Sequence, residues 1–279
     1  MLLSDAVPLK APFRRYVDLW GLSPDGMPVL TRSSHLLPVL RDGKPAMLKI
    51  ARHAEERAGN ALMRWWGGEG AVRVFACEGD AILMERAAGD RSLAAMARGG
   101  MDSEAVEIIC SVAQKLHAGR AEPPPPLTPL ARWFEPLEPA ALQLGGVLRQ
   151  SLETAGELLN APVDSVVLHG DLHHGNVLDG GPRGWLAIDP KGLSGERAFD
   201  FANIFCNPDA GVATAPGRLA AQASVVAKAA GLDRHRLLRW ILAYAGLSAA
   251  WSLADGDDPG LAFQIAKLAA KELALPCAG

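Results

Sequence analysis

One short stretch, residues 169–176 followed by Asp189, constrains this chain more than any other part. Its sequence is His-Gly-Asp-Leu-His-His-Gly-Asn. The apolar residues 166–168 predict a strand leading into a loop, and residues 176–178 and 185–188 predict a hairpin after it, with 179–182 as its turn. Asn176 and Asp189 stand at the two ends of this hairpin. A carboxylate (Asp171), an amide and a second carboxylate are therefore expected close together.

This set of groups suits phosphoryl transfer, in which an enzyme mainly positions groups and offsets charge. Asn176 and Asp189 offer the hard oxygen ligands that Mg²⁺ prefers, with room left for phosphate and water. Asp171 would accept a hydrogen bond from a substrate hydroxyl, and His169 would brace the loop. The alternative is that Asp171 and Asn176 only cap a turn, as these residue types often do.

The whole chain limits the classes of protein and partner. It has 279 residues, enough for one large domain or two smaller ones, with 49% hydrophobic and 21% charged residues. Its net charge of −3 does not suggest a nucleic-acid partner. An acidic balance would suit a cationic substrate if the negative charge gathers at one cleft.

Nothing in the sequence predicts a membrane or secreted protein. Cys77, Cys110, Cys206 and Cys277 form no C-x-x-C pair, which favours reduced and mostly buried thiols. The N-terminus lacks a signal-peptide pattern. The longest uncharged apolar run, residues 240–254, is too short to cross a bilayer and predicts a buried helix. We expect a cytoplasmic protein.

The two halves of the chain differ in character. The first half predicts strands near residues 13–20, 28–33 and 46–50, a helix over 52–66 closed by Gly67, and strands over 72–76 and 81–85. After Gly89, apolar spacings of three and four at positions 106, 109, 113 and 116 predict helix. The proline run 123–126 predicts a stiff connector, and helices follow from about Ala198.

Four segments carry a resemblance to a known family: residues 168–176, 184–190, 70–73 and 246–251. Together they resemble the aminoglycoside phosphotransferase family of the protein-kinase-like fold. They are most similar to its subgroup of streptomycin 6-phosphotransferases and hydroxyurea phosphotransferases. The similarity runs from about Pro28 to Ala254, most of the chain.

The resemblance implies an α+β, bilobal fold. Residues 1–87 would form a nucleotide-binding lobe of antiparallel sheet plus one helix, and residues 88–279 a mainly helical catalytic and acceptor-binding lobe. It also implies ATP and Mg²⁺ as cofactors and transfer to a small hydroxylated acceptor, streptomycin or a related aminoglycoside. A kinase for hydroxyurea, an amino alcohol or a sugar is the alternative, and a catalytically silent nucleotide-binding module is another.

Lys49 lies in an apolar strand, where a lysine commonly marks a solvent-facing edge. The family resemblance instead implies that it contacts nucleotide phosphates and pairs with a glutamate of the following helix. Glu56 matches the family best, with Glu55 as the reserve. The two point about 100° apart on a helix, so only one can face the cleft.

The sequence departs from protein kinases around the phosphates. No G-x-G-x-x-G loop precedes Lys49, so backbone amides and the hydroxyls of Ser33 and Ser34 would cover them. By analogy, the backbone at Glu85 and Ala87 would bind adenine where the lobes join. Gly170 stands where protein kinases usually have arginine, which points towards kinases of small molecules.

Further departures follow Asp189. Pro190 replaces the phenylalanine of protein kinases and restrains Asp189 towards extended conformations, which argues against a flipping regulatory segment. Lys191 either neutralises the transferred phosphate or lies at the surface.

A zinc-dependent hydrolase is a rival of a different class. His169, Asp171, His173 and His174 superficially resemble its ligand clusters. Such a site needs further ligands, for which His117 and His235 offer no pattern. His174 is better explained as packing beside the loop or lining an acceptor pocket.

Two other pairs have open roles. Glu196 and Asp200 either interact with a helix dipole, fix the catalytic loop or bind substrate. Trp251 and Asp255 lie one helical turn apart and could line the acceptor site, although a tryptophan is more often part of a core.

Overall fold

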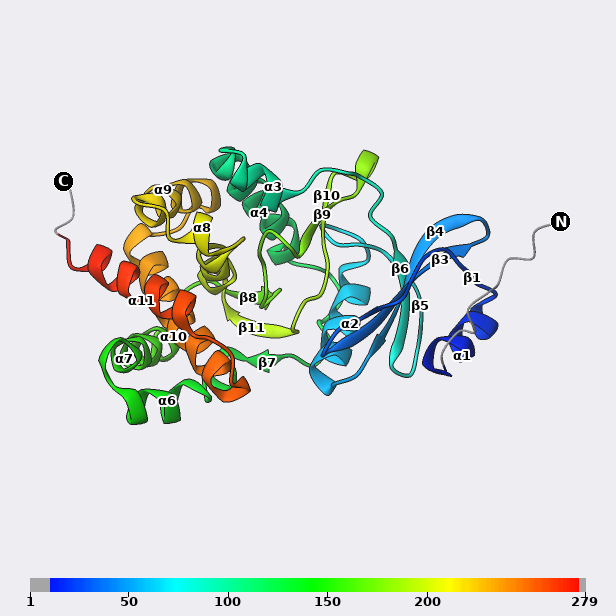
Figure 1. Cartoon of the computed structure of the whole chain (residues 1–279). Helices are drawn as coiled ribbons and strands as arrows, with labels where there is room; N and C mark the ends of the chain where they lie inside the picture. The colour runs from blue at the N-terminus through cyan, green and yellow to red at the C-terminus, as the bar shows by residue number, and fades with distance from the viewer. Residues whose placement is uncertain (1–10, 276–279) are drawn as a thin grey trace.

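The computed structural model describes residues 11–275, which form a sheet-based lobe and a larger, mainly helical lobe (Figure 1). The sheet has the order β1-β3-β4-β6-β5, with antiparallel pairings throughout. Helix α2 (Ala54–Trp66) follows β4 and ends at Gly67, whose φ of 60° lies in the left-handed region that glycine adopts readily. The strands are β1 (Ser23–Pro24), β2 (Val29–Leu30), which pairs with β3, β3 (Ser34–Arg41), β4 (Lys44–Ala51), β5 (Val74–Glu78) and β6 (Ala81–Glu85).

Two of the strands expected from the sequence are wrong. Residues 13–20 belong to helix α1 (Ala11–Trp20), whose Phe13 and Tyr16, three residues apart, are buried against the sheet. Residues 28–33 contain only the two residues of β2, and the long strand begins at Ser34. Proline is disfavoured in central strands, so the presence of Pro38 argues against a strand at the residues of β3. The structure tolerates Pro38 because it lies just beyond the residues of β3 that pair with β1.

The second lobe confirms the expected change to helix. Its helix α4 buries the apolar positions 106, 109, 113 and 116, and the proline run 123–126 joins α4 to the short strand β7 (Thr128–Pro129). The helices are α3 (Leu93–Arg98), α4 (Asp102–His117), α5 (Leu130–Trp133), α6 (Leu137–Leu144), α7 (Gly146–Asn160), the 3₁₀ helix η2 (Arg197–Cys206), α8 (Ala210–Ala213), α9 (Arg218–Ala230), α10 (Arg234–Asp255) and α11 (Gly260–Leu273).

Short strands hold the loop that the sequence singles out. Strand β8 (Ser165–Leu168) leads into it, as expected, and β11 (Leu193–Glu196) pairs with β8 antiparallel and with β7 parallel. Strands β9 (Val177–Asp179) and β10 (Trp185–Ala187) form the expected antiparallel hairpin, with a 3₁₀ turn, η1 (Gly181–Arg183), between them. Asn176 and Asp189 therefore flank one hairpin.

The two lobes share one hydrophobic core. Leu62, Met63 and Trp66 of α2 and Ile82 of β6 belong to the same buried cluster as the helices of the second lobe. A smaller cluster lies between α1 and the other side of the sheet. Ala71 also bridges to Ala187 of β10. The position of α2 is thus set by packing against both lobes.

Helix α10 contains the apolar run 240–254. It is long and apolar enough for a membrane span by length and composition, yet 67% of that window is buried inside the protein, which confirms a buried core helix. Among the cysteines, Cys110 is buried and Cys206 partly buried, whereas Cys77 is exposed. Cys277 and the N-terminal residues 1–10 lie outside the described residues.

Candidate active site

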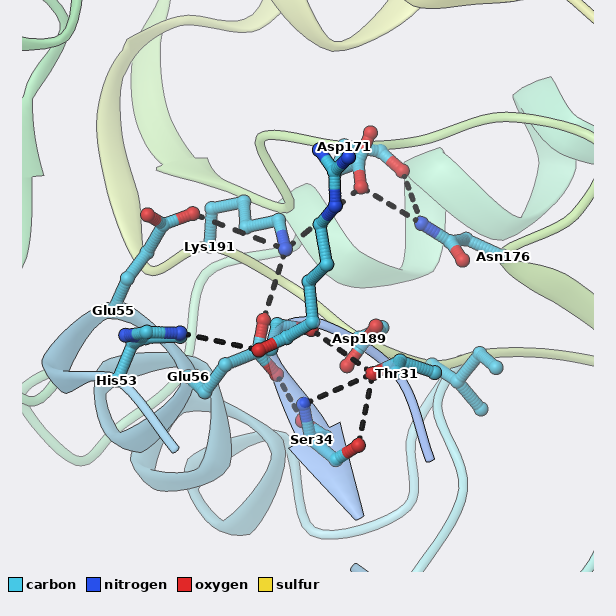
Figure 2. Close-up of polar contacts among 12 residues, drawn as sticks. Thr31, Ser34, His53, Glu55, Glu56, Asp171, Asn176, Asp189 and Lys191 are labelled. Carbon is cyan, nitrogen blue, oxygen red and sulfur yellow. Dashed lines mark hydrogen bonds and ion pairs between the residues drawn. The ribbon is translucent and has the colours of Figure 1, made fainter. Parts of the chain in front are cut away.

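Lys49 forms a buried ion-pair network between the lobes. It lies on β4, which has β3 on one side and β6 on the other, so the edge-strand alternative is wrong. Its ammonium pairs with Glu56 of α2 and with Asp189, and only 4% of its side chain is exposed. The expected choice of Glu56 over Glu55 is confirmed. Figure 2 labels Glu56 and Asp189, the two residues that pair with Lys49.

Glu56 is held ionised by its neighbours. Burial alone would raise the pKa of this carboxyl, but the charges and hydrogen bonds of Lys49 and Lys191 outweigh burial and lower the pKa to about 2. Lys191 Nζ donates to Glu56 Oε1 at 3.1 Å, and the Ser34 hydroxyl donates to Oε2 at 3.0 Å. Lys191 therefore lies inside the site, and the surface alternative for it is wrong.

Asp171 lies where the loop meets the cleft. Its Oδ2 accepts from Asn176 Nδ2 at 3.1 Å, and its Oδ1 accepts from Asn203 Nδ2 at 2.8 Å, so two amides fix the plane of the carboxylate. Protein atoms surround most of the group, and its side chain is 28% exposed where it lines the cleft. This burial raises the pKa of Asp171 to about 7, against the opposing charge of Lys191. A carboxylate tuned to this range suits general-base work.

Asp189 corrects one expectation. Its φ is 64°, in the left-handed region, and not extended as Pro190 was expected to impose. Aspartate tolerates this region better than most residues, and here the turn directs its carboxylate at Lys49. Pro190 packs directly on α2: a Cβ added to Gly59 would lie 1.9 Å from the Pro190 carbonyl oxygen. Helix and turn are in backbone contact.

Asn176 and Asp189 have the right chemistry for Mg²⁺. The Asn176 amide nitrogen is already committed to the main-chain oxygen and carboxylate of Asp171, which leaves its Oδ1 for a cation. Asp189 supplies a carboxylate beside it in the chain fold. Hard oxygens of these two kinds fit a magnesium ion that also keeps phosphate oxygens and water as ligands.

Asp200 fixes the catalytic loop, one of the roles left open by the sequence. Its carboxylate accepts from the backbone amides of His169, at 2.8 Å, and Gly170, at 2.7 Å, and from His117 Nε2 at 2.7 Å. Glu196 has another role: it binds Arg236 and the Trp240 indole in the core.

His169 braces the loop, as expected. Its Nδ1 accepts from the Asp171 amide at 3.2 Å, and its Nε2 donates to the Ile188 carbonyl at 2.8 Å. Its ring stacks on Trp66. Burial lowers the pKa of His169 to about 4, so the ring is neutral.

The zinc-hydrolase alternative is wrong for the described residues 11–275, where no group of three or more His, Cys, Asp or Glu could hold a metal. His173 Nδ1 accepts from the Gly175 amide. His174 is buried, with Nε2 3.8 Å from Asp102 Oδ1, so it packs beside the loop. It does not line the cavity next to Asp171 that is described below.

The expected nucleotide contacts are positioned as follows. The Thr31 hydroxyl closes the turn by hydrogen bonding to the Ser34 backbone. The Ser34 hydroxyl donates a hydrogen bond to Glu56. Ser33 lies beside this turn and is half-buried. Glu85 ends β6, where its side chain binds Arg183, and Ala87 follows between the lobes. Whether these residues contact a nucleotide stays a prediction.

A cavity of about 830 Å³ opens beside Asp171. Trp251 and Asp255 line it, as the sequence suggested, and Trp251 also packs edge-on against Trp133, with ring centroids 5.4 Å apart. Other lining residues come from distant segments: Glu55, Arg132, Trp133, Glu135, Lys191 and Tyr244. Sequence reasoning missed Arg132, Trp133, Glu135 and Tyr244, together with Asn203 and the role of His117.

Comparisons with known proteins agree with this geometry. Residues 19–256 match the family described as aminoglycoside/hydroxyurea antibiotic resistance kinase. The chain is 51% identical to streptomycin 3''-kinase of Klebsiella pneumoniae, over 86% of this chain and 92% of that protein. It is 33% identical to streptomycin 6-kinase of Streptomyces griseus, over 89% of this chain and 84% of the relative. It is 30% identical to hydroxyurea phosphotransferase of Kitasatospora aureofaciens, over 87% and 72%.

Solved structures share the fold. One is a thermostable mutant of an aminoglycoside phosphotransferase in ternary complex with ADP and hygromycin B, with a TM-score of 0.67, 14% identity and coverage of 96% of this chain and 100% of that one. Another is an ethanolamine kinase of Plasmodium vivax, with a TM-score of 0.63, 16% identity and coverage of 94% and 85%. The bilobal, kinase-like fold expected from the sequence is confirmed.

Proposed function

The chain belongs to the family of aminoglycoside/hydroxyurea antibiotic resistance kinases, and on this premise we propose that it transfers a phosphoryl group from ATP to a hydroxyl of streptomycin. The reaction class, phosphoryl transfer to an alcohol, is that of its named relatives. The acceptor, the nucleotide and the roles of individual residues are the proposal. Because ATP is its donor, we place the enzyme in the cytoplasm.

The cavity beside Asp171 is the observation that carries this proposal. It joins the proposed base to a wall with the carboxylates of Glu55, Glu135 and Asp255 and the rings of Trp133 and Trp251. Carboxylates and aromatic faces both attract guanidinium groups. A guanidinylated aminocyclitol antibiotic such as streptomycin presents such groups together with hydroxyls.

The residues divide the work in this proposal. Lys49, held by Glu56, contacts the α- and β-phosphates. Asn176 and Asp189 hold Mg²⁺, which when bound neutralises charge on phosphate oxygens. Asp171 accepts the proton of the acceptor hydroxyl while Asn203 and Asn176 hold its carboxylate in place. The bond from the acceptor oxygen to phosphorus forms as the bond to the ADP oxygen breaks.

The division into lobes follows the same proposal. We assign the described residues up to Ala87 to the nucleotide-binding lobe, with adenine against the backbone at Glu85 and Ala87 and phosphates under the turn at Ser33 and Ser34. We assign the described residues from 88 onwards to the lobe with the loop and the acceptor cavity.

The phosphorylated hydroxyl is expected at the 3'' position. Identity to the streptomycin 3''-kinase is 51%, against 33% to the 6-kinase of Streptomyces griseus. A difference in identity of this size over comparable lengths favours an acceptor pocket like that of the 3''-kinase over one like that of the 6-kinase.

A direct assay tests the acceptor and the position. Purified protein with Mg²⁺ and ATP is incubated with streptomycin, hygromycin B, hydroxyurea, ethanolamine and simple sugars, and products are identified by mass. We expect one phosphoryl group on streptomycin, placed at the 3'' oxygen by phosphorus–proton NMR correlation. The Asp171→Asn protein is the control for contaminating kinases. Exclusive reaction with another acceptor would contradict the streptomycin assignment and leave phosphoryl transfer intact.

A further inference from the structure

Two departures from the protein-kinase pattern, at Gly170 and at Lys191, lie against each other in the structure. Gly170 has a φ of 85°, and a Cβ added to it would lie 3.1 Å from the Lys191 Cβ and 2.8 Å from Leu193 Cδ1. The Lys191 amide donates to the His169 carbonyl at 2.7 Å. A side chain at position 170 would therefore be strained by the backbone conformation and would press on the side chain of Leu193 and the Cβ of Lys191. Gly170 thus leaves space for the close packing of the residues after Asp189.

Lys191 reaches between the nucleotide site and the base. Its Nζ lies 3.1 Å from Glu56 Oε1, 3.8 Å from Glu55 Oε1 and 4.0 Å from Asp171 Oδ2 (Figure 2). Its side chain is 16% exposed, and the exposed part lines the acceptor cavity together with Asp171. The ammonium thus lies among the carboxylates of Glu55, Glu56 and Asp171, on a side chain that lines the cavity where an acceptor would sit.

The charges around the site leave a gap that Lys191 can fill. Lys49, which pairs with Glu56 and Asp189, is assigned above to the α- and β-phosphates and not to the group in transfer. In place of a glycine-rich loop, the phosphates have the short turn at Ser33 and Ser34, and the Ser34 hydroxyl is bound to Glu56. A phosphoryl group that moves from a nucleotide near Asp189 to a hydroxyl near Asp171 would pass a cluster of carboxylates, and charge on its oxygens must be offset there.

We propose that Lys191 is a catalytic residue whose ammonium donates hydrogen bonds to the phosphoryl group in transfer. The inference rests on the proposed function and adds a residue to it. In the step, the acceptor oxygen bonds to phosphorus, the bond to the bridging oxygen of ADP breaks with its electron pair, and the hydroxyl proton goes to Asp171. Lys191 keeps its protons. The rival role is structural: a tie between Glu56 and the turn after Asp189.

Lys191→Met and Lys191→Arg test the proposal, with Lys267→Met, an exposed lysine of α11, as the matched control. We expect kcat of the Met protein to fall about 10²–10³-fold, the usual cost of one lost transition-state donor. The Kd of ADP should change little. The Tm should fall by only a few degrees, because Glu56 loses one hydrogen bond but keeps Lys49 as its partner. Binding of ADP with aluminium fluoride, which mimics the phosphoryl group in transfer, should be weakened about as much as kcat. Lys191→Arg should recover part of both losses, and Lys267→Met should match the wild type.

Two results would overturn the proposal. In one, Lys191→Met keeps kcat within about threefold of the wild type. In the other, kcat, ADP affinity and Tm all fall together, as expected for a structural tie. A wild-type protein that phosphorylates no acceptor would contradict the proposed function instead. Slow ATP hydrolysis by water, compared between wild type and Lys191→Met, then still decides on Lys191.

Discussion

The two sides of Asp171 are built differently. On the side proposed for the phosphates, Lys49, Glu56, Asp189 and Lys191 form a compact network of ion pairs. On the side proposed for the acceptor, a cavity of about 830 Å³ is lined by residues of several elements, among them Trp133 and Trp251, whose rings pack edge-on.

The difference shows how one fold separates chemistry from specificity. The phosphate side comes from short segments, a strand with its following helix and a loop with its following hairpin, so local sequence fixes it. The acceptor side takes residues from α2, α5 and α10, which only the tertiary fold brings together. Substitutions on the first side should damage turnover or folding, and those on the second should change which acceptor binds.

The largest effect is expected where the two sides meet. Asp171→Asn keeps the size of the side chain but removes the base, so kcat should fall about 10²–10⁴-fold. The Kd of ADP and the Tm should stay close to wild type, since the change creates no cavity. Stopped-time assays of phosphorylated product measure kcat. An Asp171→Asn protein with wild-type kcat would show that Asp171 is not the base, and Asp171 would then no longer be the point where the two sides meet.

Glu56→Gln should break the phosphate side as a structural unit. It removes one of the two carboxylates that pair with the buried ammonium of Lys49 and leaves Asp189 as the other, so we expect a loss of about 1.5–3 kcal/mol of unfolding free energy, as for a hydrogen bond to a charged group. Urea unfolding measures this. Glu55→Gln is the matched control: its side chain is 46% exposed and it lies 3.8 Å from Lys191, so we expect a loss below about 1 kcal/mol. Equal losses of unfolding free energy in the two variants would show that the buried ion pair of Glu56 does not stabilise the fold more than the exposed Glu55 does.

Acid should reduce the stability that His169 contributes by bracing the loop. The pKa of His169 is lowered by burial to about 4 in the folded protein, against about 6.5 when unfolded. The unfolded chain therefore binds the proton more readily, and the contribution of His169 to stability should fall as pH drops from about 6.5 to about 4, by about 3 kcal/mol. The raised pKa of Asp171 acts in the opposite direction, so this contribution is the difference between the pH profiles of the wild type and of His169→Gln. Urea unfolding at a series of pH values checks this. His169→Gln should flatten the dependence, and an unchanged slope would contradict this explanation.

The smallest effect is expected on the acceptor side. Asp255 is largely exposed at the cavity rim, so Asp255→Asn should raise the KM of streptomycin by about fivefold, worth about 1 kcal/mol. The KM of ATP and kcat should hold. Glu153→Gln, an exposed carboxylate of α7 away from the cavity, is the control. A change confined to the KM of ATP would show that Asp255 acts on nucleotide binding and would contradict its assignment to the acceptor side.

The sequence predicted the phosphate side well because its signals are local. Asp171, Asn176 and Asp189 are joined by one loop and one hairpin, and Glu56 lies in the first turn of the helix that follows the strand of Lys49. The exact conformation of Asp189 was missed, since its left-handed φ depends on how Pro190 packs against Gly59.

The acceptor side was mostly beyond prediction. Trp133 and Glu135 lie after the proline run, in a segment without a chemical motif, and reach the site only because β7 pairs with β11. Helix α1 was mistaken for a strand because Phe13 and Tyr16 alone do not decide between the two periods. Asn203 had one usable signal, its place one turn after Asp200 in η2.

The close approach of Gly59 to Pro190 has a consequence for any motion of α2. In protein kinases the position of the corresponding helix is a means of control. Here a swing of α2 away from Asp189 would have to break this backbone contact as well as the ion pair of the buried glutamate with Lys49, so such a motion would be costly.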